Sequence, residues 1–262
     1  TPSILQFYPG VGVKRDVSSK PELELYALRG LLSVEYLLMP AGSQADFLAE
    51  DAQTGFVFDG LTGDGVYARY RNENAVPMGF TYDCYVTQEQ FETVKEDARG
   101  NLLMRAICLS PEQVALYSHL MRPLEDYELS GFSYEAYVED CADRRASSSS
   151  GFHADEKGFT AEISLPRENL VFFSVPYDEG FTAYVNGEKM PIEKVSNGMS
   201  AVFVPAGDNT IEFSYRTPGL ALSEPVTLAG WTVWFFYVGA LLWNRHKKSQ
   251  LISKISDSQK GA

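Results

Sequence analysis

A run of eighteen uncharged residues near the C-terminus constrains this chain more than any other feature. Residues 226–243 read VTLAGWTVWFFYVGALLW. A helix of that length rises roughly 27 Å, close to the thickness of the hydrocarbon core of a bilayer. Aromatic and aliphatic residues surround such a helix, whereas a helix of a soluble protein usually keeps one polar face. We therefore expect a transmembrane helix. The alternative is a buried core helix, since the run is short for a span and contains two glycines.

The charges on either side of this run predict its orientation. The tail at residues 244–262 holds five basic residues and one acidic residue, so it carries +4, and the preceding residues carry −17. The basic cluster Asn244-Arg245-His246-Lys247-Lys248 follows the run at once. Such clusters mark the cytoplasmic side of a span, and tryptophans toward both ends suit the two interfaces. We predict that residues 1–225 are extracytoplasmic and that the tail is cytoplasmic.

The start of the chain lacks the features of an export signal. It opens Thr1-Pro2-Ser3, with neither a methionine nor an apolar leader segment. An extracytoplasmic region needs such a signal, so we expect a fragment of a longer protein with at least one more membrane segment upstream. A mature N-terminus left by signal cleavage is the alternative.

Composition excludes several classes of partner and site. The net charge of −13 opposes binding to phosphate backbones, so nucleic acid is not an expected partner. Three cysteines with wide spacing, Cys84, Cys108 and Cys141, form neither a disulfide framework nor a zinc pattern. We expect them to act as small buried hydrophobic residues. The three histidines are too far apart in sequence to suggest a local metal site, and no cofactor is predicted.

The first half of the chain predicts a mixture of helices and strands. Residues 1–19 read as extended or irregular chain. Strand-like runs at 55–58 and 66–70 flank a turn-rich stretch and predict a hairpin. Thr87, followed three residues later by Gln90, predicts a capping box at the start of a helix. Further helices are predicted at residues 21–30, 43–48, 101–109 and 111–120, and strands at 31–39, 78–86 and 132–138.

From residue 158 onward the pattern indicates an antiparallel β structure. Asn186-Gly187 and Asn197-Gly198 each lie between strand-like runs, and this dipeptide is a strong hairpin signal. Several strands within about 60 residues indicate a β-sandwich or barrel, immunoglobulin-like or jelly-roll-like. The strands are predicted at residues 159–165, 169–175, 181–185, 188–192, 194–196, 199–204 and 210–215.

These patterns predict an α+β fold in four parts. The stretch RRASSSSG at residues 144–151 is interpreted as a mobile segment, either a linker between domains or a long hairpin loop within one β domain. The predicted parts are a mixed α+β extracytoplasmic region at 1–130, an antiparallel β-sandwich at 131–218, a transmembrane helix at 226–243 and a basic cytoplasmic tail at 244–262.

Few residues carry a chemical signature. The chain lacks the nucleophile-elbow, zinc-protease, P-loop and dinucleotide-binding motifs, so we predict no catalytic residue and no metal ligand. Acidic pairs occur by chance in a chain with 35 acidic residues and are interpreted as solvated surface. Aromatic side chains stack on sugar rings, but they also fill sandwich cores. The best exposed ligand-binding candidates are Tyr177, Asp178 and Phe181, in the turn SVPYDEGF.

Residues 169–219 read NLVFFSVPYDEGFTAYVNGEKMPIEKVSNGMSAVFVPAGDNTIEFSYRTPG and lead into the apolar run. This segment resembles the C-terminal end of the YfhO family of bacterial multi-pass membrane proteins. The family pattern there is an apolar strand, an aromatic turn, an Asn/Asp-Gly hairpin, a further strand and a final span. A tryptophan usually follows the turn glycine where this chain has Phe181. Residues 28–37 and 70–80 agree with two earlier family stretches. The matching segments are Pro176-Tyr177-Asp178, Gly180-Phe181, Val185-Asn186-Gly187, Glu212-Phe213, Tyr215 and Pro218-Gly219.

This resemblance implies a function at the bacterial cell membrane. The family resembles membrane glycosyltransferases that transfer sugar from a lipid carrier to cell-wall polymers such as teichoic acids. Their catalytic acidic residue lies in an early extracytoplasmic loop without a counterpart here, so this region is expected to be accessory and not catalytic. Expected partners are the membrane lipid bilayer, the upstream membrane domain of the same protein, and a lipid-linked sugar or cell-wall polymer. The alternatives are a membrane-tethered carbohydrate- or protein-binding module without enzymatic activity, and a cell-surface structural domain.

Overall fold

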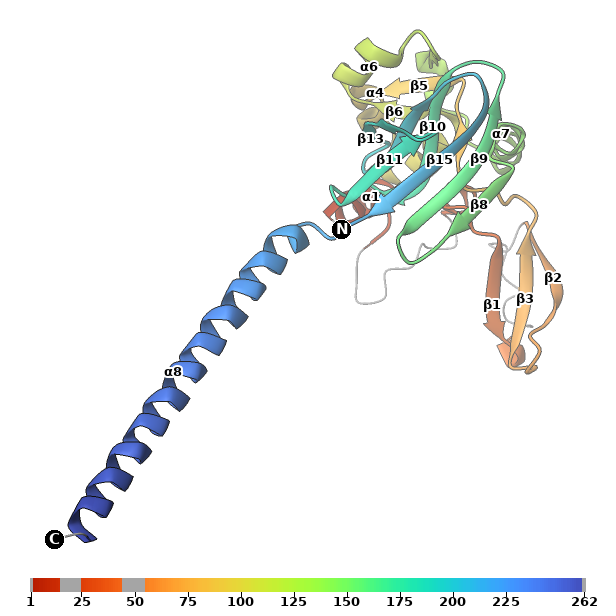
Figure 1. Ribbon diagram of the computed structural model, residues 1–262. Helices are drawn as coiled ribbons and strands as arrows, with labels where there is room; N and C mark the ends of the chain where they lie inside the picture. The colour runs from red at the N-terminus through yellow and green to blue at the C-terminus, as the bar shows by residue number, and fades with distance from the viewer. Residues whose placement is uncertain (1, 15–24, 44–54, 261–262) are drawn as a thin grey trace. The chain divides into compact units, whose positions relative to one another are not determined.

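The computed structural model describes residues 2–14, 25–43 and 55–260 and divides the chain into two compact units (Figure 1). The first unit, Thr1–Tyr215, contains helices, three antiparallel sheets and one parallel sheet among its described residues. The second unit, Arg216–Ala262, contains helix α8 (Leu220–Lys260). The predicted α+β fold with one apolar C-terminal helix is therefore confirmed.

Two antiparallel sheets pack face to face as a sandwich. One has the strand order β13-β14-β10-β4 and the other β12-β11-β15-β9-β8. Phe173, Val202 and Phe213 belong to the buried cluster between the two sheets. The strands are β4 (Phe80–Thr81), β8 (Gly151–Ala154), β9 (Gly158–Leu165), β10 (Asn169–Pro176), β11 (Phe181–Val185), β12 (Glu188–Met190), β13 (Ile192–Val195), β14 (Met199–Val204) and β15 (Gly207–Tyr215).

Strand β10 is buried on both of its faces. Val171 and Phe173 point into the sandwich core, whereas Leu170 and Phe172 belong to a second core on the other side of the same sheet. Side chains of a strand alternate between faces, so a strand covered on both sides needs an uninterrupted apolar sequence. This double burial explains the continuous apolar run in the sequence.

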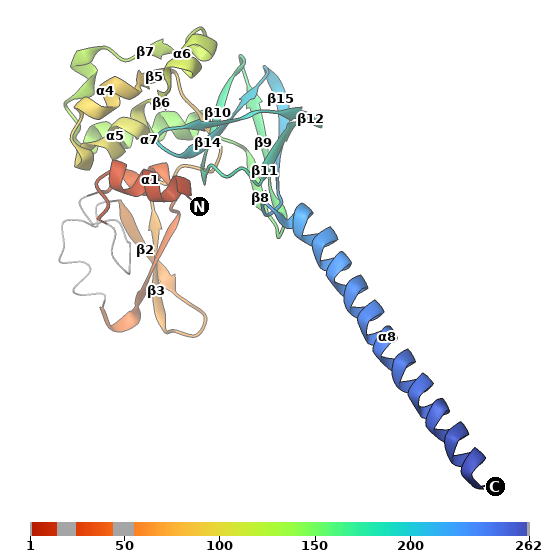
Figure 2. The same cartoon turned by 90° about the vertical axis from the view of Figure 1, so that its left-hand side faces the viewer.

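A layer of helices and a small parallel sheet covers the outer face of the β10 sheet (Figure 2). The parallel sheet has the order β6-β5-β7. Thr87 accepts the amide of Gln90 at 3.2 Å and starts helix α4, which confirms the predicted capping box. The elements are β5 (Cys84–Thr87), β6 (Ile107–Leu109), β7 (Arg122–Pro123), α2 (Ala27–Leu31), α4 (Gln88–Thr93), α5 (Arg99–Arg105), α6 (Pro111–Tyr117), α7 (Tyr134–Ala146), η3 (Glu96–Ala98) and η4 (Asp126–Leu129).

The turns predicted from Asn-Gly dipeptides are present. Asn186 and Gly187 adopt φ values of 54° and 82°, as the two central residues of a type I′ turn require, and they join β11 to β12. Asn197 and Gly198, at φ values of 61° and 132°, join β13 to β14. Both dipeptides therefore fix the register of antiparallel neighbours.

The segment around residue 134 corrects one prediction. The alternation at residues 132–138 predicted a strand, but the chain forms the 13-residue helix α7. The Ser133 hydroxyl caps this helix by accepting the Ala136 amide at 3.2 Å. Tyr137 and Cys141, spaced four residues apart, are both buried on the face that packs inward. The helical spacing of the buried residues overrides the apparent period of two.

The serine-rich segment that follows is held in place. Residues 144–146 complete helix α7 and Gly151 begins strand β8, so residues 147–150 of the predicted mobile stretch connect these two elements. The Ser149 hydroxyl donates to the Met78 carbonyl at 2.6 Å, and the Ser147 carbonyl accepts the Thr81 amide at 3.2 Å. The serine side chains and backbone thus attach this connection to the chain around β4.

Other predicted boundaries also shift. Residues 2–10 form helix α1 (Pro2–Gly10) instead of irregular chain, because Phe7 is fully buried and Asn197 donates to the Gln6 carbonyl at 3.1 Å. The helix predicted at 101–109 ends at Arg105 and continues as strand β6. The strand predicted at 78–86 divides into β4 and β5, and the one at 31–39 begins only at Tyr36. The helix predicted at 43–48 and the start of that at 21–30 lie outside the described residues.

A three-stranded antiparallel sheet of order β1-β3-β2 contains the predicted hairpin. Its strands are β1 (Tyr36–Pro40), β2 (Phe56–Leu61) and β3 (Tyr67–Asn72), and the short helix η1 (Ala41–Ser43) follows β1. The sheet has its own small core, in which Ala68 and Tyr70 are buried against Leu37, Met39 and Phe56.

Helix α8 contains a segment suited to crossing a membrane. Pro225–Lys248 is the one helical segment among the described residues that is long and apolar enough, with a mean hydropathy of 1.5. None of this segment's most apolar window is buried. The alternative of a buried core helix is therefore wrong, because Phe236 exposes 77% of its surface and Trp243 exposes 68%.

Candidate functional site

A hollow of the first unit lies between helix α4 and the η4 segment. It encloses about 810 Å³ and is open to solvent. Its wall on one side comes from α4 and the residues that follow it, and on the other side from η4 and the chain leading to α7. We name it the α4–η4 groove. The lining residues are Glu89, Gln90, Thr93, Val94, Lys95, Ala98, Asp126, Leu129, Ser130, Gly131 and Phe132.

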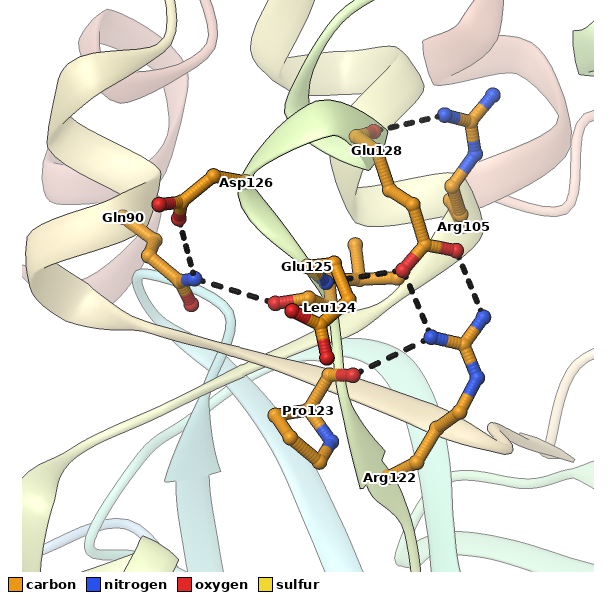
Figure 3. A network of polar contacts seen from close by, with 8 residues as sticks. All are labelled: Gln90, Arg105, Arg122, Pro123, Leu124, Glu125, Asp126 and Glu128. Atoms are coloured by element: carbon orange, nitrogen blue, oxygen red, sulfur yellow. Dashed lines mark hydrogen bonds and ion pairs between the residues drawn. The ribbon is translucent and has the colours of Figure 1, made fainter.

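Gln90 joins the two walls of the groove. Its side-chain oxygen accepts the Thr87 amide at 3.2 Å as part of the capping box of α4. Its side-chain nitrogen donates to the Leu124 carbonyl at 3.2 Å and lies 3.4 Å from the Asp126 carboxylate (Figure 3). One amide therefore begins a helix and ties it to a segment more than thirty residues away.

An ion pair holds the far wall in shape. Arg122 donates to both carboxylate oxygens of Glu128 at 2.7 Å, and the Glu125 amide donates to the same carboxylate at 2.9 Å (Figure 3). The bond from Arg122, together with that from the Glu125 amide, lowers the pKa of Glu128 to about 2. Glu128 is thus ionised at neutral pH, and its role is structural.

Arg105 connects this wall to the helices behind it. Its guanidinium donates to the Glu128 carbonyl at 3.0 Å and lies 5.0 Å from the centre of the Phe132 ring. It also lies 3.4 Å from the carboxylate of Asp140 on helix α7. Burial raises the pKa of Asp140 despite the neighbouring arginines. Phe132 is thereby fixed at the edge of the groove by an arginine on one side.

A second hollow of about 670 Å³ adjoins the first. The two share Lys95, Ala98 and Phe132, so the surface is recessed continuously along α4, η3 and α5. The second hollow adds the side chains of Tyr26 and Asn101. The half-buried ring of Phe132 thus lies in a recess that is also lined by carboxylate, amide, hydroxyl and ammonium groups.

The groups that line this recess can bind a polyhydroxylated ligand. Sugar hydroxyls both donate and accept hydrogen bonds, so carboxylates, amides and hydroxyls satisfy them, while the apolar sugar face packs on an aromatic ring. In the described part of the chain, no three His, Cys, Asp or Glu side chains gather as metal ligands would.

The three residues proposed from the sequence lie elsewhere, at the β10–β11 turn. Tyr177 and Phe181 line a shallow hollow of about 300 Å³. The Asp178 carboxylate accepts the Gly180 amide at 2.9 Å and shapes the turn. Phe181 packs edge-on against Tyr215, with ring centres 4.9 Å apart. The structure therefore brings Tyr177 and Phe181 to one hollow and gives the Asp178 carboxylate a bond within the turn.

The cysteines are packed as small apolar groups. Cys108 and Cys141 are buried, Cys84 is half-buried, and all three are free thiols. Burial raises the pKa of Cys108 to about 12 and that of Cys141 to about 11. These thiols remain protonated at neutral pH and are poor nucleophiles.

Sequence reasoning did not find the α4–η4 groove. Its walls come from separate parts of the chain, residues 89–98 and 126–132, and Phe132 was assigned to a strand. The available signal was the Thr87–Gln90 capping box, which identified Gln90 but not its second role.

An α+β unit joined to an exposed helix that is long and apolar enough to cross a membrane is the pattern of a membrane-anchored protein. Residues 122–227 match the model of a family described as bacterial membrane protein YfhO, a range that runs from β7 through the sandwich into α8. A protein described as uncharacterized protein YfhO, from Bacillus subtilis (strain 168), is 21% identical over 184 residues. That alignment covers 67% of this chain and 21% of the relative.

These matches confirm the resemblance to the YfhO family of bacterial membrane proteins. The chain spans about a fifth of the length of the curated relative it matches. No solved structure matches the chain significantly.

Proposed function

We propose that this chain is the extracytoplasmic C-terminal part, with its final span, of a multi-pass bacterial membrane glycosyltransferase. In this proposal it engages the glycan acceptor and leaves sugar transfer from the lipid carrier to the upstream membrane domain. The observation that carries the proposal is the family match, which extends over residues 122–227, from β7 into helix α8.

The charge distribution supports the proposed topology. The span is followed by the cluster at residues 244–248, which suits the cytoplasmic face, and the unit before the span is strongly acidic. Residues 1–225 then face the outer side of the membrane, where cell-wall polymers such as teichoic acids are assembled.

The α4–η4 groove supports an acceptor-binding role. Glu89, Thr93 and Ser130 offer polar groups at its rim, and Phe132 offers an aromatic edge. Since the whole chain has a net charge of −13, a phosphate-bearing polymer is expected to bind weakly unless divalent cations bridge the charges. A neutral oligosaccharide does not meet this repulsion.

Binding to the groove is measured with the full chain in nanodiscs, titrated with neutral cell-wall oligosaccharides. A variant carrying Glu89→Ala and Ser130→Ala is expected to bind about five- to thirtyfold more weakly, since it loses two hydrogen-bonding groups of roughly 0.5–1 kcal/mol each. The control is Glu156→Ala, in the exposed turn between β8 and β9. Equal oligosaccharide binding by the groove variant and the control would contradict a binding role for the α4–η4 groove.

The accessory role is tested in the complete membrane protein with a lipid-linked sugar donor. The groove variant is expected to raise KM for the acceptor and to leave kcat unchanged, because the groove contributes binding and no chemistry. A fall in kcat with unchanged KM would contradict the accessory role. Glycan binding without transfer by any form of the protein would instead favour a membrane-tethered binding module.

A further inference from the structure

Strand β1 presents apolar side chains that the described residues of its unit leave exposed. It reads YLLMP, without one charged side chain, yet Tyr36 and Leu38 expose 43% and 54% of their surfaces. Strand β10 has a comparable apolar run and is buried on both faces. A strand with one face in water is expected to carry polar residues there, so β1 has the sequence of a strand covered on both sides.

The neighbouring strands extend this surface. In the β1–β3 register Tyr36 lies opposite Arg71 and Pro40 lies opposite Tyr67, and Arg71 in turn lies opposite Val57 of β2. Paired residues of an antiparallel sheet share a face. Among the described residues up to Tyr215, twelve large hydrophobic side chains are exposed, and seven belong to this sheet or its turn: Tyr36, Leu38, Val57, Phe58, Leu61, Val66 and Tyr67. Phe58 and Leu61 pair with Tyr70 and Ala68, so these two lie on the opposite face of the sheet.

The polar groups on this surface are of a particular kind. The Arg69 guanidinium lies 5.4 Å from the centre of the Tyr36 ring and 2.9 Å from the Asp59 carboxylate. Tyrosine is enriched at membrane interfaces, and arginine extends its apolar stem along hydrocarbon while its charge stays in the headgroup layer. Tyrosines and arginines among exposed aliphatic side chains therefore match the chemistry of a lipid interface.

From these observations we propose that the β1–β3 sheet docks on the bilayer surface. The docking surface consists of Tyr36, Leu38, Val57 and Tyr67, and Val66 lies next to it in the β2–β3 turn. Helix α8 keeps the unit tethered to the same membrane, so even a weak contact is populated through a high effective concentration. Two arginines, Arg69 and Arg71, also lie on this face of the sheet. Their positive charges lower the repulsion between the strongly acidic unit and anionic lipid.

The contact is mainly apolar. Because Arg69 already pairs with Asp59, its attraction to anionic headgroups is largely offset. Lipid contact is therefore expected to differ by less than about threefold between zwitterionic vesicles and vesicles with anionic lipid. This inference concerns the position of the unit on the membrane and does not depend on the reaction proposed above.

The test places an environment-sensitive fluorophore on the full chain reconstituted in phosphatidylcholine vesicles, with and without phosphatidylglycerol. A cysteine replaces Val66, which is 52% exposed, in a Cys84→Ala background that removes the half-buried native thiol. The label is expected to emit at shorter wavelength, to be quenched by spin-labelled lipid and to be protected from iodide. A label at Glu156→Cys, in the exposed β8–β9 turn, is the control and is expected to behave as in water.

A second variant distinguishes lipid contact made by these apolar side chains from nearness to the membrane that the tether alone would produce. Combining Leu38→Ser with Tyr67→Ser removes two exposed apolar groups and is expected to reduce lipid quenching at position 66 at least threefold. Amide exchange in β10 reports whether the fold is retained. Quenching equal to that of the control label would overturn the proposal. Protection from iodide without lipid quenching, or protection that grows with the protein-to-lipid ratio, would also overturn it and indicate another protein or a second copy.

Discussion

At the scale of single residues, Glu128 shows how one side chain organises the groove wall. Its carboxylate accepts two bonds from Arg122 and one from the Glu125 amide, while its backbone carbonyl accepts Arg105. These partners stabilise the ionised form, so its pKa of about 2 in the folded chain lies below the value of about 4.3 expected when unfolded. Its contribution to stability is therefore fully present above the unfolded pKa and is lost as pH falls toward about 2.

The corresponding prediction is that Glu128→Gln destabilises the first unit by about 1 kcal/mol at pH 7. The estimate is small because Arg122 is more than half exposed, so solvent screens the pair. Urea unfolding of the full chain in detergent measures the difference, which should shrink steadily as pH falls from about 4 to 2. Glu139→Gln, on the exposed side of α7, is the matched control. A difference that stays constant across this range would contradict the assigned pairing.

At the scale of elements, the sequence predicts those features that depend on residues close together in the chain. It does not predict features that depend on contacts between distant segments. The Asn186-Gly187 turn, the Thr87 capping box and the alternation of β9 are local, and the sequence alone predicts each of them correctly. Helix α7 was missed because its apolar residues match a period of two as well as a helical face. The α4–η4 groove was missed because separate segments meet only after packing.

Two glycines with positive φ predict contrasting effects within the sandwich. A Cβ on Gly158 would overlap the Phe213 carbonyl of the paired strand β15, whereas a Cβ on Gly187 would meet open space at a φ of 82°. Gly158→Ala is therefore expected to cost more than about 3 kcal/mol of unfolding free energy, and Gly187→Ala only about 1 kcal/mol. Chemical unfolding of both variants tests whether Gly158→Ala lowers the unfolding free energy more than Gly187→Ala does. Equal effects would show that β9 and β15 can separate at Gly158 with little cost.

At the scale of the whole molecule, the chain combines an acidic α+β unit with a strongly apolar helix. Helix α8 buries none of its most apolar window, so in water it would expose aromatic residues such as Trp231 and Phe236. The membrane removes this surface from water. The sequence predicted this part of the architecture well, because span length, missing charge and the basic tail are all composition-level signals.

The whole-molecule prediction concerns extraction from membranes. The full chain is expected to stay in the membrane pellet after alkaline carbonate treatment. Val233→Arg together with Ala240→Arg places two charges in the span, each costing about 2.5–3.5 kcal/mol, and should release most of the protein. Arginine placed instead at Ser130, in the first unit, is the control and should leave the chain in the pellet. Release of the unmodified chain would contradict a membrane-spanning α8.

The double burial of β10 also governs how the first unit loses its structure. Leu170 and Phe172 belong to the core beneath the helices, while Val171 and Phe173 belong to the sandwich core. Unfolding of either core removes packing from the same strand. The helical layer and the sandwich therefore cannot separate without exposing residues of β10. The two layers are therefore expected to unfold as one cooperative unit. A destabilising substitution in the helical layer should also lower the stability of the sandwich.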